Sequence, residues 1–562
     1  METNIIFDLS IEDPQLLRNA VEDFTGVSPP AMLLLPCRQE QHLNKEGNDT
    51  YRIVVRLVTL QKVLSPITVE PSLVYNPHIL FKMGIRDIKI PSDEEWKQTC
   101  EVFTSLSRLM PERKIYHYIG HHPDKPEYIL GQFKITSSMV TRVNNALVQG
   151  HMEYDVKATA DIWLNCFVGC FKKPIQGAIM LMVFLLSFFL SQLEKITFER
   201  PTIVPALIGR TGSFKTSFVQ AALTPYGNGA AVFSSFTDSL RGIIETIKRS
   251  TDTVSIVDDF CEFDDKAINQ KLEQIIRING DRTSTRRVMI GNKPDDRPNN
   301  SITIITGEDI PKVKPSSIAR MLIFEMTDSI DADALTKLQH SQKKLIGVLI
   351  KFIQFLLFKG DAAYELLQKF RDYRNELTHS ATKPEWHARY SEMYAWLVAM
   401  EDIFVEFCNE QGVDTRSLAK FKDECLDFIL LQHKRYLKSD SVYIFFDVAS
   451  QLVSNGALSI VDVSHISKDN LRSKYDVIVD GNEKHYDSIS VFNAVQRYCT
   501  DHGIVFQTGR KQLYETLVRE GLLCRRGGKN TAEYRKHGIR ESTICIYRNI
   551  LKRYLDQGGD AQ

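Results

Sequence analysis

The chain begins with a polar segment and then changes to short alternating runs of apolar and polar residues. Residues 1–45 are mixed and become polar toward their end, which suggests an N-terminal appendage and a linker. Residues 51–134 alternate in short runs such as YRIVVRLVTL and GIRDIKIP, with proline and glycine between them. This period of two predicts strands, interrupted by one helix near residues 93–109. From residue 138 to 195 the apolar spacing becomes helical.

The second half of the chain shows a different order of patterns. Residues 202–326 contain apolar β-like runs that alternate with helical segments, which is typical of a parallel α/β core. Residues 332–438 follow a helical pattern almost throughout, and residues 440–562 form a smaller mixed tail. The predicted regions are a 1–50 N-terminal appendage, a 51–150 β-rich domain, a 151–330 α/β core, a 331–440 helical region and a 441–562 C-terminal domain.

One apolar run, GAIMLMVFLLSFFLSQL at residues 177–193, is similar to a membrane span. It falls short of the ~20 apolar residues that a span needs. It also ends just before the α/β core. We therefore predict a buried helix packed on the sheet of that core, and no membrane association.

The composition indicates the cellular compartment of the protein but does not indicate a binding partner. The 562 residues carry a formal net charge of zero, so any basic surface is local. The 10 cysteines are scattered, and their spacing does not resemble a zinc ribbon, which favours a reducing, cytoplasmic location. The N-terminus lacks the basic and apolar stretches of a signal peptide.

The most informative segment is GRTGSFKT, residues 209–216, which follows the apolar run TIVPALI. It fits the phosphate-binding pattern G-x-x-x-x-G-K-[ST] except that Phe214 stands where the second glycine belongs. A phenylalanine there requires a negative φ or mild strain, and Gly212 would restore the freedom of the turn. The alternative is a strand, turn and helix with a chance Lys-Thr pair. The predicted nucleotide-binding residues are Gly209, Gly212, Ser213, Lys215 and Thr216.

Acidic and polar residues end the next two apolar runs. TVSIV is followed by Asp258 and Asp259, and ITIITGED contains Thr306. We predict that Thr216 and Asp258 hold Mg²⁺, directly or through water. Asp259 stands where many such enzymes use a glutamate to polarise the attacking water, and Thr306 is the candidate sensor of the γ-phosphate. The alternative is a strand that ends in a solvated acidic turn.

Arg320 precedes a further apolar run in PSSIARMLIFEM. An arginine at this point is suited to reach the γ-phosphate of a neighbouring subunit, as arginine fingers do. The alternative is a surface arginine that caps the preceding turn. The predicted catalytic residues are therefore Asp259, Thr306 and Arg320, and the predicted cofactors are ATP and Mg²⁺.

These motifs, in this order, resemble those of the AAA+ ATPases of an uncharacterised domain family found beside primases on mobile genetic elements. Within that group the chain is most similar to the self-loading, MCM-like replicative helicases of staphylococcal-type cassettes and pathogenicity islands. The segments that carry the resemblance are GRTGSFKT, SIVDD, NGDRTSTRR, ITGE and SSIAR. The resemblance covers roughly residues 50–330 and includes a β-rich region before the ATPase. It implies a homo-hexamer that encircles DNA and hydrolyses ATP between subunits.

The resemblance also implies a hairpin facing the pore, formed by residues 280–300. This segment is rich in arginine and lysine around a turn-like GNKPDD centre. Cations on a hairpin suit a phosphate backbone without reading bases. The candidate DNA-binding residues here are Arg286, Arg287 and Lys293, and the alternative is a solvated basic loop.

Residues 487–562 are typical of a winged helix. Two helical segments, SISVFNAVQRYCTDHG and RKQLYETLVREGLL, precede a predicted two-stranded wing, and basic residues cluster in this part of the neutral chain. Such a module binds duplex or junction DNA, although winged helices also mediate protein contacts. The candidate DNA-binding residues are Arg510, Lys511, Arg525 and Arg526.

The predicted fold class is thus multidomain α/β, with an AAA+ P-loop core, a β-rich N-terminal region, a helical region and a C-terminal winged helix. The favoured function is a DNA helicase or replication initiator of a mobile element that acts on single-stranded and forked DNA. A primase or a single-strand-binding protein is a further candidate partner. The alternatives are a non-motor P-loop switch that acts through protein partners, and an ATPase that packages or transports DNA.

Overall fold

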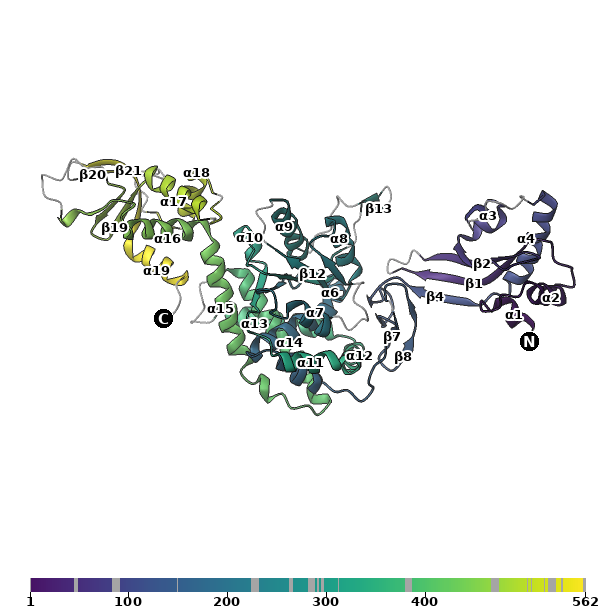
Figure 1. The fold of residues 1–562 in the computed structure, drawn as a ribbon. Helices are drawn as coiled ribbons and strands as arrows, with labels where there is room; N and C mark the ends of the chain where they lie inside the picture. Colours follow the sequence, from purple (N-terminus) through teal and green to yellow (C-terminus); the bar gives the residue numbers. More distant parts are fainter. Residues whose placement is uncertain are drawn as a thin grey trace.

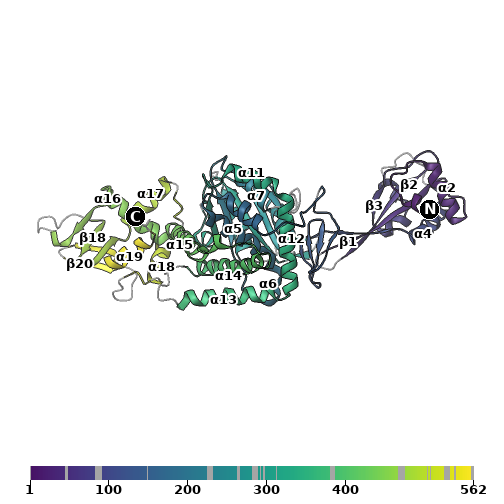
Figure 2. The same cartoon turned by 90° about the horizontal axis from the view of Figure 1, so that it is seen from below.

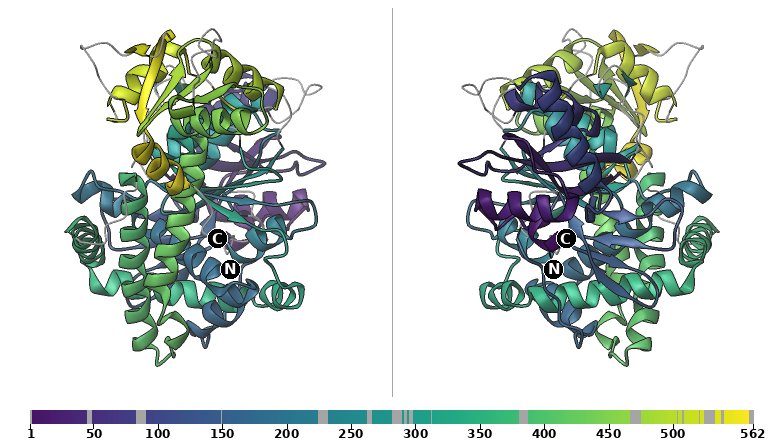
Figure 3. Two further views of the ribbon diagram at one scale, coloured as in Figure 1. Left: turned by 90° about the vertical axis from the view of Figure 1, so that its left-hand side faces the viewer. Right: turned by 90° about the vertical axis from the view of Figure 1, so that its right-hand side faces the viewer.

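A computed structural model shows three bodies that follow one another along the chain and along the long axis of the molecule (Figure 1). The structure describes residues 2–558 apart from 45–48, 83–90, 149, 224–231, 262–265, 282–288, 291–292, 295–297, 312, 380–386, 466–474, 503, 507, 520, 524–531 and 537–538. In the end-on views of Figure 3, the C-terminal body faces the reader on the left and the N-terminal body on the right.

The N-terminal body is a five-stranded sheet with the order β3-β2-β1-β4-β9, covered by helices. Its strands are β1 (Leu33–Leu43), β2 (Thr50–Val58), β3 (Ile67–Val69), β4 (Glu112–Tyr116) and β9 (Asn144–Asn145). Its helices are α1 (Glu2–Phe7), α2 (Pro14–Thr25), α3 (Ile79–Lys82) and α4 (Asp93–Ser107). The helix predicted near residues 93–109 is α4, which begins with a capping box formed by Ser92 and Glu95.

The predicted border at residue 50 falls inside this sheet. Strand β1 pairs with β2 from Leu33 to His42, and α1 and α2 pack under the same strands through Ile6, Leu17 and Val21. The described part of residues 1–50 therefore packs with the β-rich region, where the sequence predicted a separate appendage. The polar end of this segment misled the prediction, because β1 continues past its buried half into a partly exposed one.

A small second sheet lies between the N-terminal body and the core. It has the order β5-β6-β7-β8, with strands β5 (Gly120–His121), β6 (Tyr128–Leu130), β7 (Phe133–Ile135) and β8 (Val140–Arg142). The Tyr128 hydroxyl donates to the carbonyl of Asp252 in the core at 2.6 Å. A Cβ on Gly120 would lie 2.5 Å from the Thr251 carbonyl oxygen, so only glycine allows this approach.

The central body is built on a parallel five-stranded sheet with the order β11-β12-β15-β10-β16. Its strands are β10 (Val204–Ile208), β11 (Phe233–Ser235), β12 (Thr253–Phe260), β15 (Ser301–Gly307) and β16 (Met321–Glu325). The connecting helices are α7 (Lys215–Ala222), α8 (Leu240–Arg249), α9 (Lys266–Gly280) and α10 (Pro315–Ile318). Both faces of the sheet are buried, as its continuous apolar runs predict.

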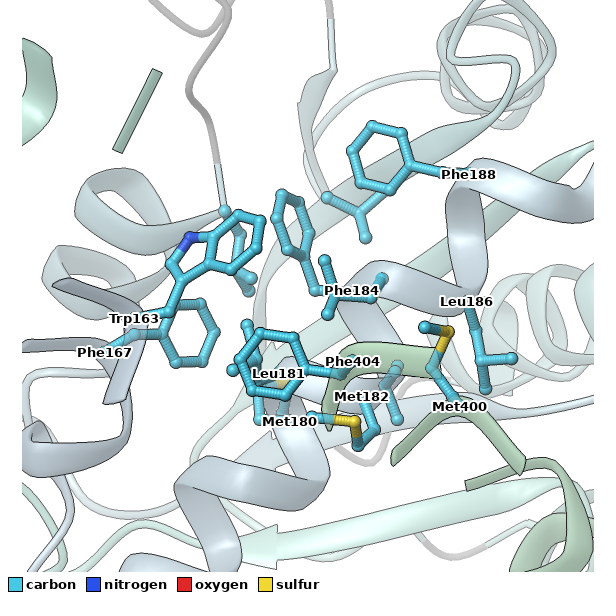
Figure 4. Packing of buried hydrophobic residues seen from close by; sticks show 14 of the residues in the cluster. Trp163, Phe167, Met180, Leu181, Met182, Phe184, Leu186, Phe188, Met400 and Phe404 are labelled. Carbon is cyan, nitrogen blue, oxygen red and sulfur yellow. The ribbon is translucent and has the colours of Figure 1, made fainter. Parts of the chain in front are cut away.

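The apolar run at residues 177–193 forms α5 (Pro174–Leu186), a 3-10 turn (Ser187–Phe189) and α6 (Leu190–Ile196). By length and composition Pro174–Ile196 is apolar enough to cross a membrane, but 89% of its most apolar window is buried inside the protein. Figure 4 shows Phe184 and Phe188 packed near Trp163 and Phe404. The prediction of a buried helix on the sheet is confirmed, because these side chains share one cluster with strand residues such as Ile256.

The helices after the sheet belong to the same hydrophobic cluster. They are α11 (Ala332–His340), α12 (Gln342–Lys359), α13 (Ala362–His379), α14 (Ala388–Glu410) and α15 (Phe421–Ser439). Phe352, Trp396 and Phe428 of this region are buried together with Leu207 and Phe324 of the sheet. The border predicted at residue 330 thus crosses a continuous core.

Helix α15 leads to the C-terminal body (Figure 2). This body has helices α16 (Ser441–Ser454), α17 (Ser490–Asp501), α18 (Arg510–Arg519) and α19 (Arg548–Gly558). Its strands are β17 (Ile460–Asp462), β18 (Val477–Asp480), β19 (Glu483–Asp487), β20 (Ala532–Lys536) and β21 (Ile539–Tyr547), with the sheet order β17-β18-β19-β21-β20. A separate hydrophobic cluster fills the space between the helices and one face of the sheet.

Candidate nucleotide site

The candidate site lies where the parallel strands of the central sheet end. Ile208 of β10 is level with Gly307 of β15 and with Glu325 of β16, so the segments after these strands lie at one edge. Val257 of β12 is level with Ile305, which brings the end of β12 to the same edge. Ligands of open α/β sheets bind outside the carboxyl ends of the strands. We call this side of the sheet the carboxyl edge.

The loop from Gly209 to Phe214 connects β10 to α7. The Lys215 ammonium lies over this loop and donates to the carbonyl of Gly209, to that of Arg210 at 3.1 Å and to the Ser213 hydroxyl at 3.2 Å. A Cβ on Gly209 would lie 2.9 Å from the Ser213 hydroxyl oxygen. The predicted loop residues are therefore together at the start of one helix.

Phe214 adopts the conformation that the missing glycine would provide. Its φ is 61° and its ψ is 15°, in the left-handed region, while Gly212 has a φ of 84°. The prediction of a negative φ is wrong at this residue, although the alternative of mild strain agrees with the angle. A bulky residue in this region costs about 1–3 kcal/mol, which the surrounding structure must offset. Its ring is 43% exposed, so core packing is not the main compensation. Helix α7 is instead held by Phe218, which packs edge-on against the ring of Phe171.

Three of the predicted site residues meet at one carboxylate oxygen. The Thr216 hydroxyl donates to Asp258 Oδ1 at 2.9 Å, and the Thr306 hydroxyl donates to the same oxygen. Thr306 is fully buried, whereas Asp258 and Thr216 are partly exposed. Hydroxyl and carboxylate oxygens are ligands that Mg²⁺ prefers, so the residues present fit a magnesium ion.

A bulge interrupts the register near the end of β12, which stays paired to β15 through Phe260. Asp258 and Asp259 lie opposite Thr306 alone, because the register shifts between Val257 and Phe260. Asp259 has a φ of 67°, and its N–H donates to the Thr306 hydroxyl at 3.1 Å. Bulges of this kind redirect side chains next to active sites. Here the bulge separates the two aspartates: Asp258 contacts Thr216, and Asp259 is exposed.

A cavity of about 660 Å³ adjoins the beginning of the loop. It lies between Gly209 and Arg210, the residues after β15 and those after β16, and its walls carry both signs of charge. Cavities of about 300–1,000 Å³ are usual for small-molecule sites. Sequence reasoning assigned no role to two of its residues, Arg210 and Glu308, although both lie inside the motifs GRTGSFKT and ITGE. Glu308 accepts a hydrogen bond from the Thr211 hydroxyl.

Negative charge at this edge extends beyond Asp258. Burial, and then the neighbouring carboxylates of Asp259 and Glu308, raises the pKa of the Cys261 thiol. The edge thus carries both acidic groups and the Lys215 ammonium. This arrangement is suited to hold a divalent cation next to an anion.

Arg320 is not at the carboxyl edge. It directly precedes β16, so the length of that five-residue strand, about 15 Å, separates it from the loop of its own chain. Its guanidinium donates to Asp281 Oδ1 from Nε at 2.8 Å and from Nη2 at 2.6 Å, and it also donates to the Ser316 carbonyl of α10. Within one chain it therefore closes the preceding turn, as the alternative prediction describes.

The candidate DNA-binding residues are only partly visible. A short antiparallel hairpin pairs β13 (Met289–Ile290) with β14 (Lys293–Pro294) and lies at the periphery of the central body (Figure 1). Arg286, Arg287, Arg525, Arg526 and the side chain of Lys293 lie outside the described residues. Arg510 and Lys511 are exposed at the beginning of α18.

Comparisons with known proteins add the following findings. The model of a domain of unknown function, DUF927, matches residues 77–276, which include the loop and Asp258. No curated protein matches the chain. A solved structure described as "SCCmec type IV Cch - active helicase" is 12% identical, with a TM-score of 0.58 over 93% of this chain and 95% of that chain. The two chains therefore share a fold over almost their whole lengths, and the predicted likeness to cassette helicases is confirmed at the level of the overall fold.

Proposed function

We propose that this protein is an ATP-driven DNA helicase of a mobile genetic element. The observation that carries the proposal is the convergence of Thr216 and Thr306 on Asp258, beside a loop covered by Lys215. The likeness in fold to a protein described as an active helicase supports the same function. The alternatives, a protein-directed switch and a DNA-transport ATPase, have no specific observation in their favour.

The proposed chemistry assigns a task to each residue at the carboxyl edge. Lys215 leaves the loop carbonyls and binds the β- and γ-phosphates, while N–H groups at the beginning of α7 bind the same anion. Bound Mg²⁺ would neutralise charge that develops on the phosphates. Thr216 and Asp258 hold that ion, Asp259 orients the attacking water, and Thr306 links the γ-phosphate to the position of Asp258.

The position of Arg320 supports a ring of subunits. Because Arg320 lies at the opposite edge of the sheet from its own loop, it is suited to complete the site of a neighbour and not its own. In a head-to-tail ring, the edge that carries Arg320 in one subunit faces the loop of the next. We propose a homo-hexamer in which each hydrolysis site lies between two chains.

Two surfaces are proposed to contact DNA. The β13–β14 hairpin would follow the single strand in the pore, through Arg286, Arg287 and Lys293. The helices α17 and α18 with the hairpin β20–β21 have the order of a winged helix, and Arg510, Lys511, Arg525 and Arg526 would bind forked or duplex DNA there. A cytoplasmic protein of this kind would act with a primase or a single-strand-binding protein.

The proposal is tested by ATP hydrolysis with and without single-stranded DNA, and by unwinding of a labelled fork. We expect turnover that DNA stimulates, strand displacement that requires ATP, and loss of both in Lys215→Ala. Lys314→Ala is the matched control, since Lys314 is an exposed lysine of the same body that pairs with Glu273 at 3.7 Å. A Lys215→Ala protein that still unwinds DNA would overturn the proposal. Hydrolysis that no DNA stimulates would favour the protein-directed switch.

A further inference from the structure

The C-terminal sheet carries a polar cluster on the face turned away from its helices. Val477, Tyr486 and Ile544 point into the helical cluster. The register then places His485 and Cys545, which are direct cross-strand partners on β19 and β21, on the opposite face. Glu483 lies two residues before His485 and therefore on the same face. We call Glu483, His485 and Cys545 the β19–β21 cluster.

The three side chains direct ligand atoms toward one another. His485 Nε2 lies 3.2 Å from Glu483 Oε2 and 3.7 Å from Cys545 Sγ, and all three ligand atoms lie within 4.8 Å of one another. In a tetrahedral zinc site with bonds of about 2.0–2.3 Å, neighbouring ligand atoms are separated by about 3.3–3.8 Å. The two distances from His485 are close to this range.

The other nitrogen of His485 is also arranged as in a metal site. Nδ1 lies 3.2 Å from the Thr543 hydroxyl oxygen, and in the tautomer whose Nδ1–H donates to that oxygen, Nε2 is free to coordinate a metal. The Tyr534 ring packs edge-on against the imidazole with 4.7 Å between centroids, and its hydroxyl donates to Asp480 at 3.2 Å. The ring orientation is thus set from two sides.

Burial and access also fit a bound ion. His485 and Cys545 are each 2% exposed, whereas the Glu483 side chain is 18% exposed. A histidine, a thiol and a carboxylate buried together are costly unless they are paired or coordinate a metal. The partial exposure of Glu483 gives solvent, and therefore an ion, access to the cluster.

We propose that the β19–β21 cluster binds one zinc ion through Glu483 Oε2, His485 Nε2 and Cys545 Sγ. On binding, the Cys545 thiol releases its proton to solvent and the thiolate coordinates the metal. The ion joins β19 to β21 and so fixes the base of the hairpin β20–β21. This inference concerns the C-terminal domain alone and does not rest on the proposed ATPase.

The test uses the full-length protein, stripped with a chelator and then reloaded with Zn²⁺ in excess Mg²⁺, which occupies any magnesium site. Metal content is measured by mass spectrometry, and affinity by competition with a chromophoric chelator. We expect about one zinc ion per chain, and an affinity that falls at least about 100-fold in Cys545→Ser and His485→Gln. Cys499→Ser is the matched control, because Cys499 is also buried in this domain but lies on α17 in the helical cluster.

Replacement of zinc by Co²⁺ gives a second measurement that needs no variant. Coordination by Cys545 predicts a thiolate-to-cobalt charge-transfer band that Cys499→Ser retains and Cys545→Ser loses. A wild-type protein without stoichiometric zinc and without this band would overturn the proposal. Equal loss of metal in Cys545→Ser and Cys499→Ser would do so as well, and the cluster would then be a hydrogen-bonded pair beside a buried thiol.

Discussion

The parallel strands of the central sheet finish at the carboxyl edge and begin at the opposite side, which we call the amino edge. These two sides of the sheet use polar residues in opposite ways. At the amino edge, Asp252 is fully buried and accepts hydrogen bonds from the N–H groups of His121 and Ser191 and from the Ser191 hydroxyl, at 2.6–3.1 Å. At the same edge Arg320 is bound to Asp281. At the carboxyl edge, Asp258 and Lys215 are partly exposed and contact the loop and two hydroxyls.

This difference separates residues that stabilise the fold from residues that are positioned for chemistry. Asp252 is fully buried and its oxygens already accept hydrogen bonds inside the protein, so no ligand can reach it. Asp258 and Lys215 at the carboxyl edge are partly exposed and can therefore bind a ligand. Substitutions at the two edges should therefore affect different measurements.

The largest effect is expected at the carboxyl edge. Asp258→Ala removes the acceptor that joins Thr216 to Thr306, so ATP turnover should fall by about 10³-fold. The free energy of unfolding should change by only about 1 kcal/mol, because Asp258 is partly exposed. Steady-state turnover and thermal unfolding of the same preparation measure both. Turnover within a few-fold of wild type would remove Asp258 from the site.

A large effect on stability is expected at the amino edge. Asp252→Ala leaves buried donors of His121 and Ser191 without this acceptor, which should cost about 3 kcal/mol. Asp328→Ala is the matched control, since Asp328 also has a positive φ, 55° against 52° for Asp252, but is exposed. It should cost less than about 1 kcal/mol. Equal losses in denaturant unfolding would mean that backbone conformation, and not the buried hydrogen bonds, sets the cost.

The helical layer that covers the sheet contains a buried carboxyl, that of Glu401, which lies at neither edge. Burial in α14, and then the neighbouring Asp402, raises the pKa of Glu401 to about 7 from its usual 4.5. The unfolded chain therefore loses this proton first, and the protein loses stability as the pH rises from about 4.5 to about 7. Glu401→Gln should remove this loss and stabilise the protein by roughly 1–3 kcal/mol at pH 8, with little gain near pH 4.5. Thermal midpoints at the two pH values test it, and an equal gain at both would contradict the assignment.

The smallest effect is expected from the substitution Phe214→Gly. Glycine adopts the left-handed conformation without strain but loses more backbone entropy on folding, and the two effects act in opposite directions. Phe214→Gly should therefore change the free energy of unfolding by only about 1 kcal/mol and leave ATP hydrolysis close to wild type. Phe214→Pro is incompatible with a positive φ and should abolish nucleotide binding. If Phe214→Gly lost hydrolysis, the exposed ring itself would have a function in the site.

The sequence predicted the carboxyl edge better than the rest of the molecule, for a physical reason. Asp258 and Thr306 each end an apolar run, and the loop that leads to Lys215 follows a third; parallel strands bring such ends together. The β19–β21 cluster has no comparable signal, because His485 and Cys545 meet only through the register of strands far apart in the chain. The pairing of β1 with β2 was missed for a different reason: the two strands are neighbours in the chain, but the polar end of β1 concealed the strand.

Arg320 shows the remaining limit. Its place before β16 was visible in the sequence, but its bond to Asp281 depends on the end of α9, where a Cβ on Gly280 would lie 2.4 Å from Arg320 Cδ. A sequence pattern cannot predict this close approach. It also cannot predict the neighbouring subunit that the proposal requires.

The most direct test of the account is to mix two inactive variants, Lys215→Ala and Arg320→Ala, in equal amounts and measure ATP turnover. If the amino edge of one subunit completes the carboxyl edge of the next, each variant alone is inactive and independent sites in mixed rings regain about a quarter of wild-type turnover. Arg389→Ala, whose guanidinium also lies near Asp281 at 3.5 Å, should retain turnover alone. Full activity of Arg320→Ala alone, or a mixture as inactive as its components, would contradict the account.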